Sequence, residues 1–151
     1  MNKLYGHPHE IQFIARNREG TLLASSCTAL NKESATVLIW DIASNWKILK
    51  MIEHHNYTVL GMEFTPDGKY FVTVSKDRRL AVFDCRDRKF DFVYGYESHS
   101  RAITSVSSNQ NSTLLVTGSR DKNVKIHDIS QQKVTDELNL GSGGIFTVSF
   151  G

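Results

Sequence analysis

The chain has 151 residues, a formal net charge of +2, 40% hydrophobic residues and 23% charged residues. This length suits one domain, the composition is that of an ordinary soluble protein, and so weak a charge does not by itself indicate nucleic-acid binding. Cys27 and Cys85 lack metal-type spacing and favour a reducing compartment. With no apolar signal segment and no run long enough to span a membrane, we expect no membrane association, and a location in the cytoplasm and also the nucleus.

Short β-rich runs recur along the chain, separated by turn residues and without a helical 3.6-residue pattern. They predict four strands in each of three successive repeats. The first four strands are Ile11–Ala15, Leu22–Ser26, Val37–Asp41 and Lys47–Met51. The next four are Val59–Phe64, Tyr70–Ser75, Leu80–Asp84 and Phe90–Tyr94. The last four are Ile103–Ser107, Leu114–Ser119, Asn123–His127 and Lys133–Leu138.

Two segments fall outside this regular pattern. After the Gly-Ser-Gly-Gly run at 141–144, residues 145–150 alternate as in an inner strand and predict the start of a fourth unit. In the first repeat, Thr28–Thr36 replaces the tight turns found at Lys76–Arg79 and Arg120–Asn123. We expect this polar insertion to project from one rim, either as a solvated loop or as a loop that contacts a partner.

The third strand of each repeat ends in an Asp that follows Trp40, Phe83 or His127, positions 43 and 44 residues apart. A histidine lies near the start of each repeat. A sequence repeat of 40–45 residues that has Gly-His near its start and Trp-Asp near its end is the signature of a WD40 propeller blade. We therefore predict an all-β WD40 β-propeller fragment of about three four-stranded blades plus one extra strand. The repeats cover about residues 5–51, 52–94 and 95–139, with a fourth blade starting at 145–151.

Closed propellers have roughly four to eight blades, so three leave two sheet faces open. The chain is then either part of a larger ring or a short open array that assembles with copies of itself.

A histidine, a hydroxyl residue and an aspartate recur in register, which suggests a hydrolase triad. An active site occurs once in a domain, however, so repetition in every repeat favours a buried structural hydrogen-bond network and predicts no catalytic residue. Phe83 cannot donate a hydrogen bond, His127 can donate in only one tautomer, and the first repeat lacks the aspartate. The predicted network comprises His7, Ser25, Trp40, His55, Thr73, Asp77, Phe83, His99, Thr117, Asp121 and His127.

Metal and cofactor binding are not predicted. No pair among the six histidines has zinc-type spacing, and the glycines at 141–144 lack the Lys-Ser/Thr and the helix of a phosphate loop. Basic residues do gather at equivalent turns, and we expect them to stack on one rim. This rim is either a solvated surface or an electrostatic footprint for an acidic protein or RNA, although interleaved acids weaken the second alternative. The rim residues are Arg78, Arg79, Arg101, Arg120 and Lys122.

Three stretches carry a closer resemblance: KLYGHPHEI…GTLLASSC, HNYTVLGMEFTPDGKYFVTVSKDRRLAVFD and SHSRAITSV…VTGSRDKNVKIHD. Together with the insertion and the order of the blades, they resemble the later WD40 repeats of the Elongator complex protein 2 family. The chain departs from that family in three places, where Lys76 replaces Arg and both Thr104 and His127 replace Trp. It is also far shorter than family members with their two consecutive propellers.

The resemblance implies a non-catalytic scaffold subunit of Elongator, which modifies the wobble uridine of certain transfer RNAs at carbon 5. It implies that the large scaffold subunit and the catalytic subunit are partners of this chain and that any contact with RNA is indirect. It also implies that the chain binds no cofactor of its own. The alternatives are a WD40 adaptor unrelated to Elongator and a propeller whose basic rim binds RNA.

Overall fold

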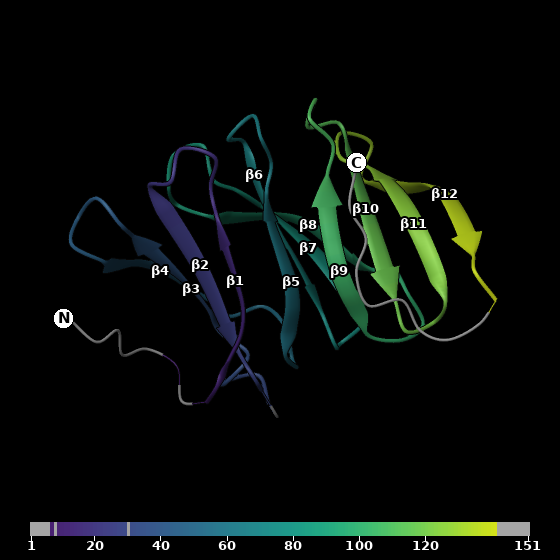
Figure 1. The fold of residues 1–151 in the computed structure, drawn as a ribbon, viewed down its shortest axis with the longest axis horizontal. Helices are drawn as coiled ribbons and strands as arrows, with labels where there is room; N and C mark the ends of the chain where they lie inside the picture. Colours follow the sequence, from purple (N-terminus) through teal and green to yellow (C-terminus); the bar gives the residue numbers. More distant parts are fainter. Residues whose placement is uncertain (1–6, 8, 30, 142–151) are drawn as a thin grey trace.

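The computed structural model describes residues 7, 9–29 and 31–141, which form twelve strands in three four-stranded antiparallel sheets (Figure 1). The first sheet contains β1 (Ile11–Arg16), β2 (Leu22–Cys27), β3 (Val37–Asp41) and β4 (Lys47–Ile52). The second contains β5 (Val59–Phe64), β6 (Tyr70–Ser75), β7 (Arg79–Asp84) and β8 (Asp91–Glu97). The third contains β9 (Ile103–Ser108), β10 (Leu114–Ser119), β11 (Asn123–Asp128) and β12 (Lys133–Asn139).

These sheets confirm the predicted all-β architecture of three four-stranded units. Within each sheet the strands follow chain order, and the first strands β1, β5 and β9 lie next to one another (Figure 1). The predicted extra strand at 145–150 lies outside the described residues. No helix in the described part of the chain is long and apolar enough to cross a bilayer.

Each sheet has two faces, which we name by the neighbour they meet. The rear face meets the preceding sheet and the forward face meets the following one. The register places Trp40, Phe83 and His127 at equivalent rear-face positions, opposite Leu23, Phe71 and Leu115 respectively. The first apolar core joins the forward face of the first sheet, including Val37 and Ile39, to the rear face of the second, including Phe71 and Phe83. The second core joins the second sheet to the third in the same way.

The strand predictions are correct to within one residue except at β8. We predicted Phe90–Tyr94, whereas the strand spans Asp91–Glu97. Phe90 has a φ of 57°, in the left-handed region that an extended strand cannot adopt. Its buried ring instead packs edge-on against Phe64 and Phe71 in the first core. The apolar Phe90 is therefore a core residue of the turn rather than the first residue of the strand.

The insertion does not project as a wholly solvated loop, which corrects the prediction. Ala29 and residues 34–36 are buried, and only Thr28 and residues 31–33 of the described part are exposed. Ala29 donates its N–H to Thr58 Oγ1 at 2.8 Å, and the Thr58 hydroxyl lies 3.1 Å from the Ala29 carbonyl oxygen. Asn31 closes the loop by accepting hydrogen bonds from the Ser34 N–H and hydroxyl. The loop folds back because Thr58, at the edge of the second sheet, satisfies its backbone.

Candidate functional site

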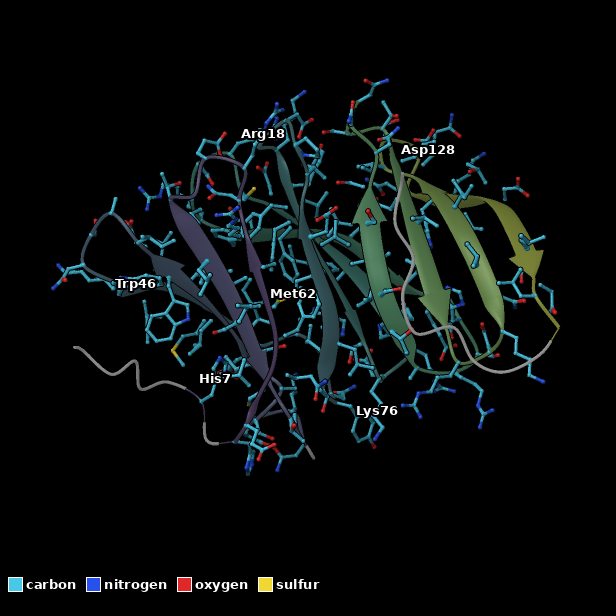
Figure 2. All side chains as sticks on the ribbon, in the orientation of Figure 1. His7, Arg18, Trp46, Met62, Lys76 and Asp128 are labelled. Atoms are coloured by element: carbon cyan, nitrogen blue, oxygen red, sulfur yellow. The ribbon has the colours of Figure 1, made fainter. Side chains whose placement is uncertain are left out.

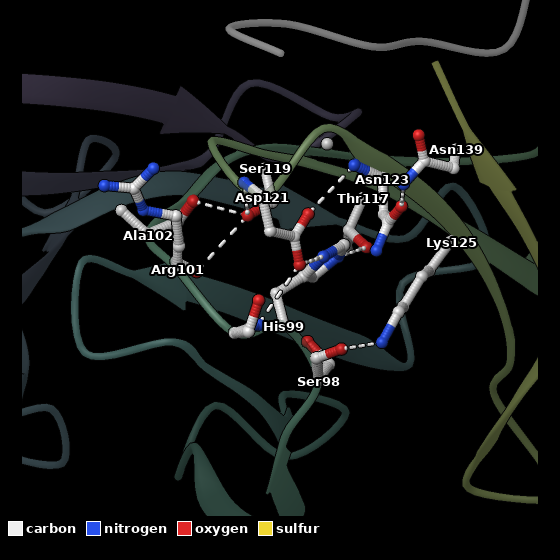
Figure 3. Close-up of polar contacts among 12 residues, drawn as sticks. Ser98, His99, Arg101, Ala102, Thr117, Ser119, Asp121, Asn123, Lys125 and Asn139 are labelled. Carbon is white, nitrogen blue, oxygen red and sulfur yellow. Dashed lines mark hydrogen bonds and ion pairs between the residues drawn. The ribbon is translucent and has the colours of Figure 1, made fainter. Parts of the chain in front are cut away.

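A continuous hydrogen-bond chain of five side chains runs from the second sheet into the third, and part of it is shown in Figure 3. Tyr96 OH lies 2.7 Å from His127 Nδ1, and His127 Nε2 lies 2.9 Å from Thr117 Oγ1. Thr117 Oγ1 lies 2.8 Å from His99 Nε2, and His99 Nδ1 lies 2.9 Å from Asp121 Oδ2. Tyr96 comes from β8 of the second sheet, so the chain also joins two sheets.

One arrangement of protons satisfies every link of this chain. The Asp121 carboxylate only accepts, so His99 carries its proton on Nδ1 and accepts from the Thr117 hydroxyl at Nε2. Thr117 oxygen then accepts from His127 Nε2–H, and His127 Nδ1 accepts from the Tyr96 hydroxyl. Both histidines are neutral in this arrangement. Burial lowers the pKa of His99, and it lowers that of His127 to about 3.

The aspartate at the end of the chain fixes the adjoining turn. Asp121 Oδ2 also accepts the N–H of Ser100 at 3.1 Å, and its Oδ1 accepts the N–H of Asn123 at 2.9 Å (Figure 3). Burial opposes ionisation, but these hydrogen bonds and the one from His99 hold the pKa of Asp121 below its ordinary value. Its side chain is 4% exposed. A charged carboxylate is therefore held by three N–H donors at the end of the sheet.

The second sheet holds a shorter version of the same chain. His55 Nδ1 lies 2.9 Å from Asp77 Oδ2, and His55 Nε2 lies 2.7 Å from Thr73 Oγ1. Burial again opposes the ionisation of Asp77, while the hydrogen bonds from His55 and from the N–H groups of Asn56 and Arg79 lower the pKa of that carboxyl. The chain stops at Thr73 because Phe83 occupies the next position, where its buried ring packs against Phe71 instead.

The first sheet retains the tryptophan end of the network. Trp40 Nε1–H donates to Ser25 Oγ at 2.8 Å, and Ser25 Oγ lies 2.7 Å from His7 Nε2. The backbone register puts Ala29 where the other two sheets have Asp77 and Asp121, since Thr28, Lys76 and Arg120 make equivalent backbone hydrogen bonds. The residue that replaces the aspartate is thus the second residue of the insertion.

Two further serines belong to the network but were not predicted. Ser119 Oγ donates to the Ala102 carbonyl at 2.8 Å and accepts the Asp121 N–H at 3.1 Å, and Ser75 makes the same pair of bonds with Thr58 and Asp77. A signal was available, because each serine lies two residues before its aspartate in the repeated pattern. Tyr96 was also not predicted. The sequence indicates it only weakly, because the one clue is that Nδ1 of His127 needs a hydrogen-bond donor.

This network cannot act as a hydrolase triad. Thr73 and Thr117, the hydroxyls in the nucleophile position, are 0% exposed. A substrate cannot reach either oxygen without opening the sheet, and both histidines are tied on two sides. Within residues 7, 9–29 and 31–141, no three His, Cys, Asp or Glu side chains are grouped to hold a metal ion. The arrangement positions turns and links sheets.

Basic side chains meet at the end of the sheets where Figure 2 labels Lys76, opposite the end with Arg18 and Asp128. We name this end the Lys76 rim. A hollow of about 490 Å³ opens there beside the starts of the inner strands, and its basic lining residues are Lys76, Arg78, Arg101 and Arg120.

The hollow gathers only three of the five predicted rim residues. Arg78, Arg101 and Arg120 line it together with Lys76, whereas Arg79 and Lys122 do not. Arg78 also lies 3.1 Å from Glu97, and both side chains are about half exposed, so this ion pair contributes little to stability. The concentration of positive charge is suited to a carboxylate or a phosphate group.

The sequence of this chain is similar to a known domain family and to several known proteins. Residues 46–84 and 90–128 match the WD40 family, described as WD domain, G-beta repeat. Elongator complex protein 2 of Mus musculus is 37% identical over 137 residues, which cover 83% of this chain and 16% of that protein. The Dictyostelium discoideum protein of the same name is 33% identical over 138 residues, which cover 88% of this chain and 15% of that protein.

Two solved structures show the same fold. "Structure of U3-55K" aligns with a TM-score of 0.86 at 17% identity, covering 97% of this chain and 44% of that one. "Crystal structure of RRP9 WD40 repeats" also aligns with a TM-score of 0.86, at 16% identity, covering 97% of this chain and 43% of that one. The three sheets therefore superpose on less than half of each solved chain.

Proposed function

Since this chain belongs to the WD40-repeat family, we propose that it is a non-catalytic scaffold that supports assembly of the complex that modifies the wobble uridine of transfer RNA at carbon 5. The observation that carries this proposal is the 37% identity to mouse Elongator complex protein 2 over 83% of the chain. The burial of every histidine–hydroxyl pair in the second and third sheets supports a role in binding rather than catalysis. Propeller blades commonly present their rims and loops to partners.

In this proposal the partners are the large scaffold subunit and the catalytic subunit of Elongator. The Lys76 rim is the contact surface, because it gathers four basic side chains around a hollow. An acidic segment of a partner would supply carboxylates that match arginine in charge and planar geometry. The resulting contact would be sensitive to salt, since exposed charges are screened over about 8 Å at physiological ionic strength.

Affinity purification of the tagged full chain from its own cells, with mass spectrometry of bound proteins, tests the proposal. We expect both large Elongator subunits to be recovered with the wild-type chain. Lys76→Glu combined with Arg101→Glu should reduce their recovery severalfold, while Lys69→Glu, an exposed charge reversal on the opposite rim, should leave it unchanged. Absence of both subunits from the wild-type sample would contradict the family role, and recovery of other proteins would favour an unrelated WD40 adaptor.

The same hollow favours a second candidate, direct binding of RNA. Four basic side chains in one depression can neutralise several phosphates and release their counterions. Fluorescence anisotropy with a single-stranded RNA oligonucleotide, repeated across salt concentrations, separates the two functions. RNA binding predicts an affinity that falls steeply with salt, and a slope that Lys76→Glu reduces by about one phosphate contact. An affinity unaffected by Lys76→Glu would exclude the rim as an RNA site.

A further inference from the structure

A hollow of about 360 Å³ lies at the outer edge of the fold, between the first and second sheets. Its wall comes from β4, from the segment that joins β4 to β5, and from β7 and the start of β8. Both flanking sheets belong to the described chain and pack against each other in the first core. We name this hollow the Phe92 groove, and its lining includes Lys50, Glu53, His54, Phe83, Asp91 and Phe92.

Three aromatic rings form one wall of the Phe92 groove. Phe92 and His54 are stacked, with ring centroids 4.7 Å apart. Phe83 meets both rings edge-on, with its centroid 5.8 Å from each. Phe83 is buried, whereas Phe92 is 51% exposed although two neighbouring rings hold it in place. The groove therefore presents a fixed aromatic surface to solvent, and the negative face of such a ring attracts cations.

Two carboxylates border the same groove. Glu53 and Asp91 are exposed, and neither forms an ion pair with another residue of the described chain. Lys50 is the one basic side chain among the described lining residues, and it forms no ion pair with either carboxylate. Burial lowers the pKa of His54, so this ring is neutral near pH 7. The groove is therefore aromatic on one side and carries an excess of negative charge at its border.

Asp91 departs from a charge pattern that the other two sheets share. Opposite the aspartate that ends the third strand, the first and third sheets have Lys47 and Lys133. The second sheet has Asp91 opposite Asp84. Like charges directly opposite each other on paired strands are destabilising. Because Arg86 forms the ion pair with Asp84 instead, the carboxylate of Asp91 is left for the groove. The needs of the sheet alone do not explain an aspartate at this position.

The pair of stacked rings is also absent from the equivalent positions of the third sheet. Val134 is equivalent in register to Phe92. Ser98 takes the place of His54, directly before the histidine of the network. A contact that serves only to pack the blades would recur, as the histidine–hydroxyl–aspartate network does in the second and third sheets. The Phe92 groove therefore has the character of a binding site rather than of a repeated packing contact.

We propose that the Phe92 groove binds an arginine side chain on an exposed segment of a partner protein. A guanidinium group stacks on an aromatic face and donates paired N–H groups to a carboxylate, so one arginine uses both the ring of Phe92 and a carboxylate at the border. An acidic segment would be repelled, and an apolar one would bury the carboxylates without partners. The Phe92 groove shares no lining residue with the Lys76 rim, which attracts the opposite charge.

Titration of the isotope-labelled full chain with N-acetyl-arginine amide, followed by NMR, tests this proposal. We expect the backbone signals of Glu53, Asp91 and Phe92 to shift in a saturable way. The citrulline derivative has nearly the same shape without the charge and should shift these signals much less. The lysine derivative carries the charge without the planar group and should bind severalfold more weakly than the arginine derivative.

Phe92→Leu tests the aromatic wall. The variant keeps an apolar side chain but removes the ring, so binding of the arginine derivative should weaken by about fivefold, the size of a cation–π contact. Val93→Ala is the matched control, because Val93 is 40% exposed on the same strand but does not line the groove. This variant should bind the arginine derivative as the wild type does.

Asp91→Lys separates binding from folding. It introduces the residue type that the first and third sheets have at this position, so the variant should melt no lower than the wild type and yet lose binding of the arginine derivative. Equal shifts with the arginine and citrulline derivatives would overturn the proposal. Binding that either Phe92→Leu or Asp91→Lys leaves unchanged would also overturn it, as would an Asp91→Lys chain that fails to fold.

Discussion

At the scale of single residues, Asp121 and Tyr96 define the two ends of the buried chain in the third sheet. Asp121 is the acceptor that fixes the tautomer of His99, and Tyr96 is the donor that satisfies the last nitrogen of His127. Every link depends on the one before it, because each neutral imidazole and the hydroxyl between them both donate and accept. Removing either end therefore leaves a buried polar group without its partner, which is more costly than the loss of one exposed hydrogen bond.

Asp121→Ala should lower the free energy of unfolding by about 2–4 kcal/mol, the range for breaking a buried hydrogen-bond network. The variant leaves His99 Nδ1 and the N–H groups of Ser100 and Asn123 without their acceptor. Chemical denaturation monitored by circular dichroism measures the change. Asp136→Ala, at an exposed position on β12, is the control and should change stability by less than about 0.5 kcal/mol. Equal stability of Asp121→Ala and wild type would refute the structural role of the network.

His127 should make the stability of the fold depend on pH. The unfolded residue binds a proton below its ordinary pKa of 6.5, whereas burial lowers the folded pKa to about 3. Between these values the unfolded state holds more protons, so the free energy of unfolding falls as the pH decreases, by up to about 1.4 kcal/mol per pH unit. Denaturation at pH 7, 6, 5 and 4 measures this slope.

The variant that isolates this effect is His127→Phe combined with Tyr96→Phe. Phenylalanine is the residue that the second sheet uses at the equivalent position, Phe83, and the second change removes a hydroxyl that would lose its acceptor. We expect a shallower pH dependence from the double variant, with the remaining slope due to His99 and the carboxylates. Identical slopes in the two proteins would show that His127 is not the titrating group.

At the scale of elements, the repeat pattern predicts strands well because each strand is a short apolar run bounded by turn residues. It placed β8 too early, ending it three residues short of Glu97 and starting it at Phe90, which belongs to the turn. It also predicted that the polar insertion projects from the rim, whereas Ala29 and Ala35 of the insertion are buried. In both cases the outcome depends on long-range contacts that local composition does not contain: the aromatic cluster around Phe71 and the hydroxyl of Thr58.

Thr58→Val should destabilise the insertion and lower the free energy of unfolding by about 1–3 kcal/mol, because the buried N–H of Ala29 loses its acceptor. The shape of the side chain is preserved, so packing changes little. Thermal melting measures the loss, and amide hydrogen exchange should show faster exchange at Ala29. Thr28→Val, an exposed change in the same loop, is the matched control. Unchanged protection at Ala29 in Thr58→Val would exclude the hydroxyl as the anchor.

At the scale of the whole molecule, the described residues 7, 9–29 and 31–141 leave the rear face of the first sheet and the forward face of the third without a neighbouring sheet. Both interfaces between neighbouring sheets bury apolar residues at equivalent strand positions. Apolar residues on the rear face of the first sheet and at Leu138 of the third sheet are exposed instead. The stability of the chain should therefore be linked to whatever covers these faces, because binding to the folded state alone stabilises it by mass action.

The sequence by itself determined the all-β class, the blade period and the partners of the histidine network, because these depend on local periodicity and on residue types that recur at fixed spacing. Only the tertiary structure decided that Tyr96 ends the chain at His127, that Lys76 joins the basic hollow while Arg79 and Lys122 do not, and that the insertion folds back onto Thr58. Each of these depends on contacts between different sheets or between neighbouring loops. Such contacts depend on how the sheets pack against one another, whereas a repeat pattern in the sequence predicts only the arrangement within one sheet.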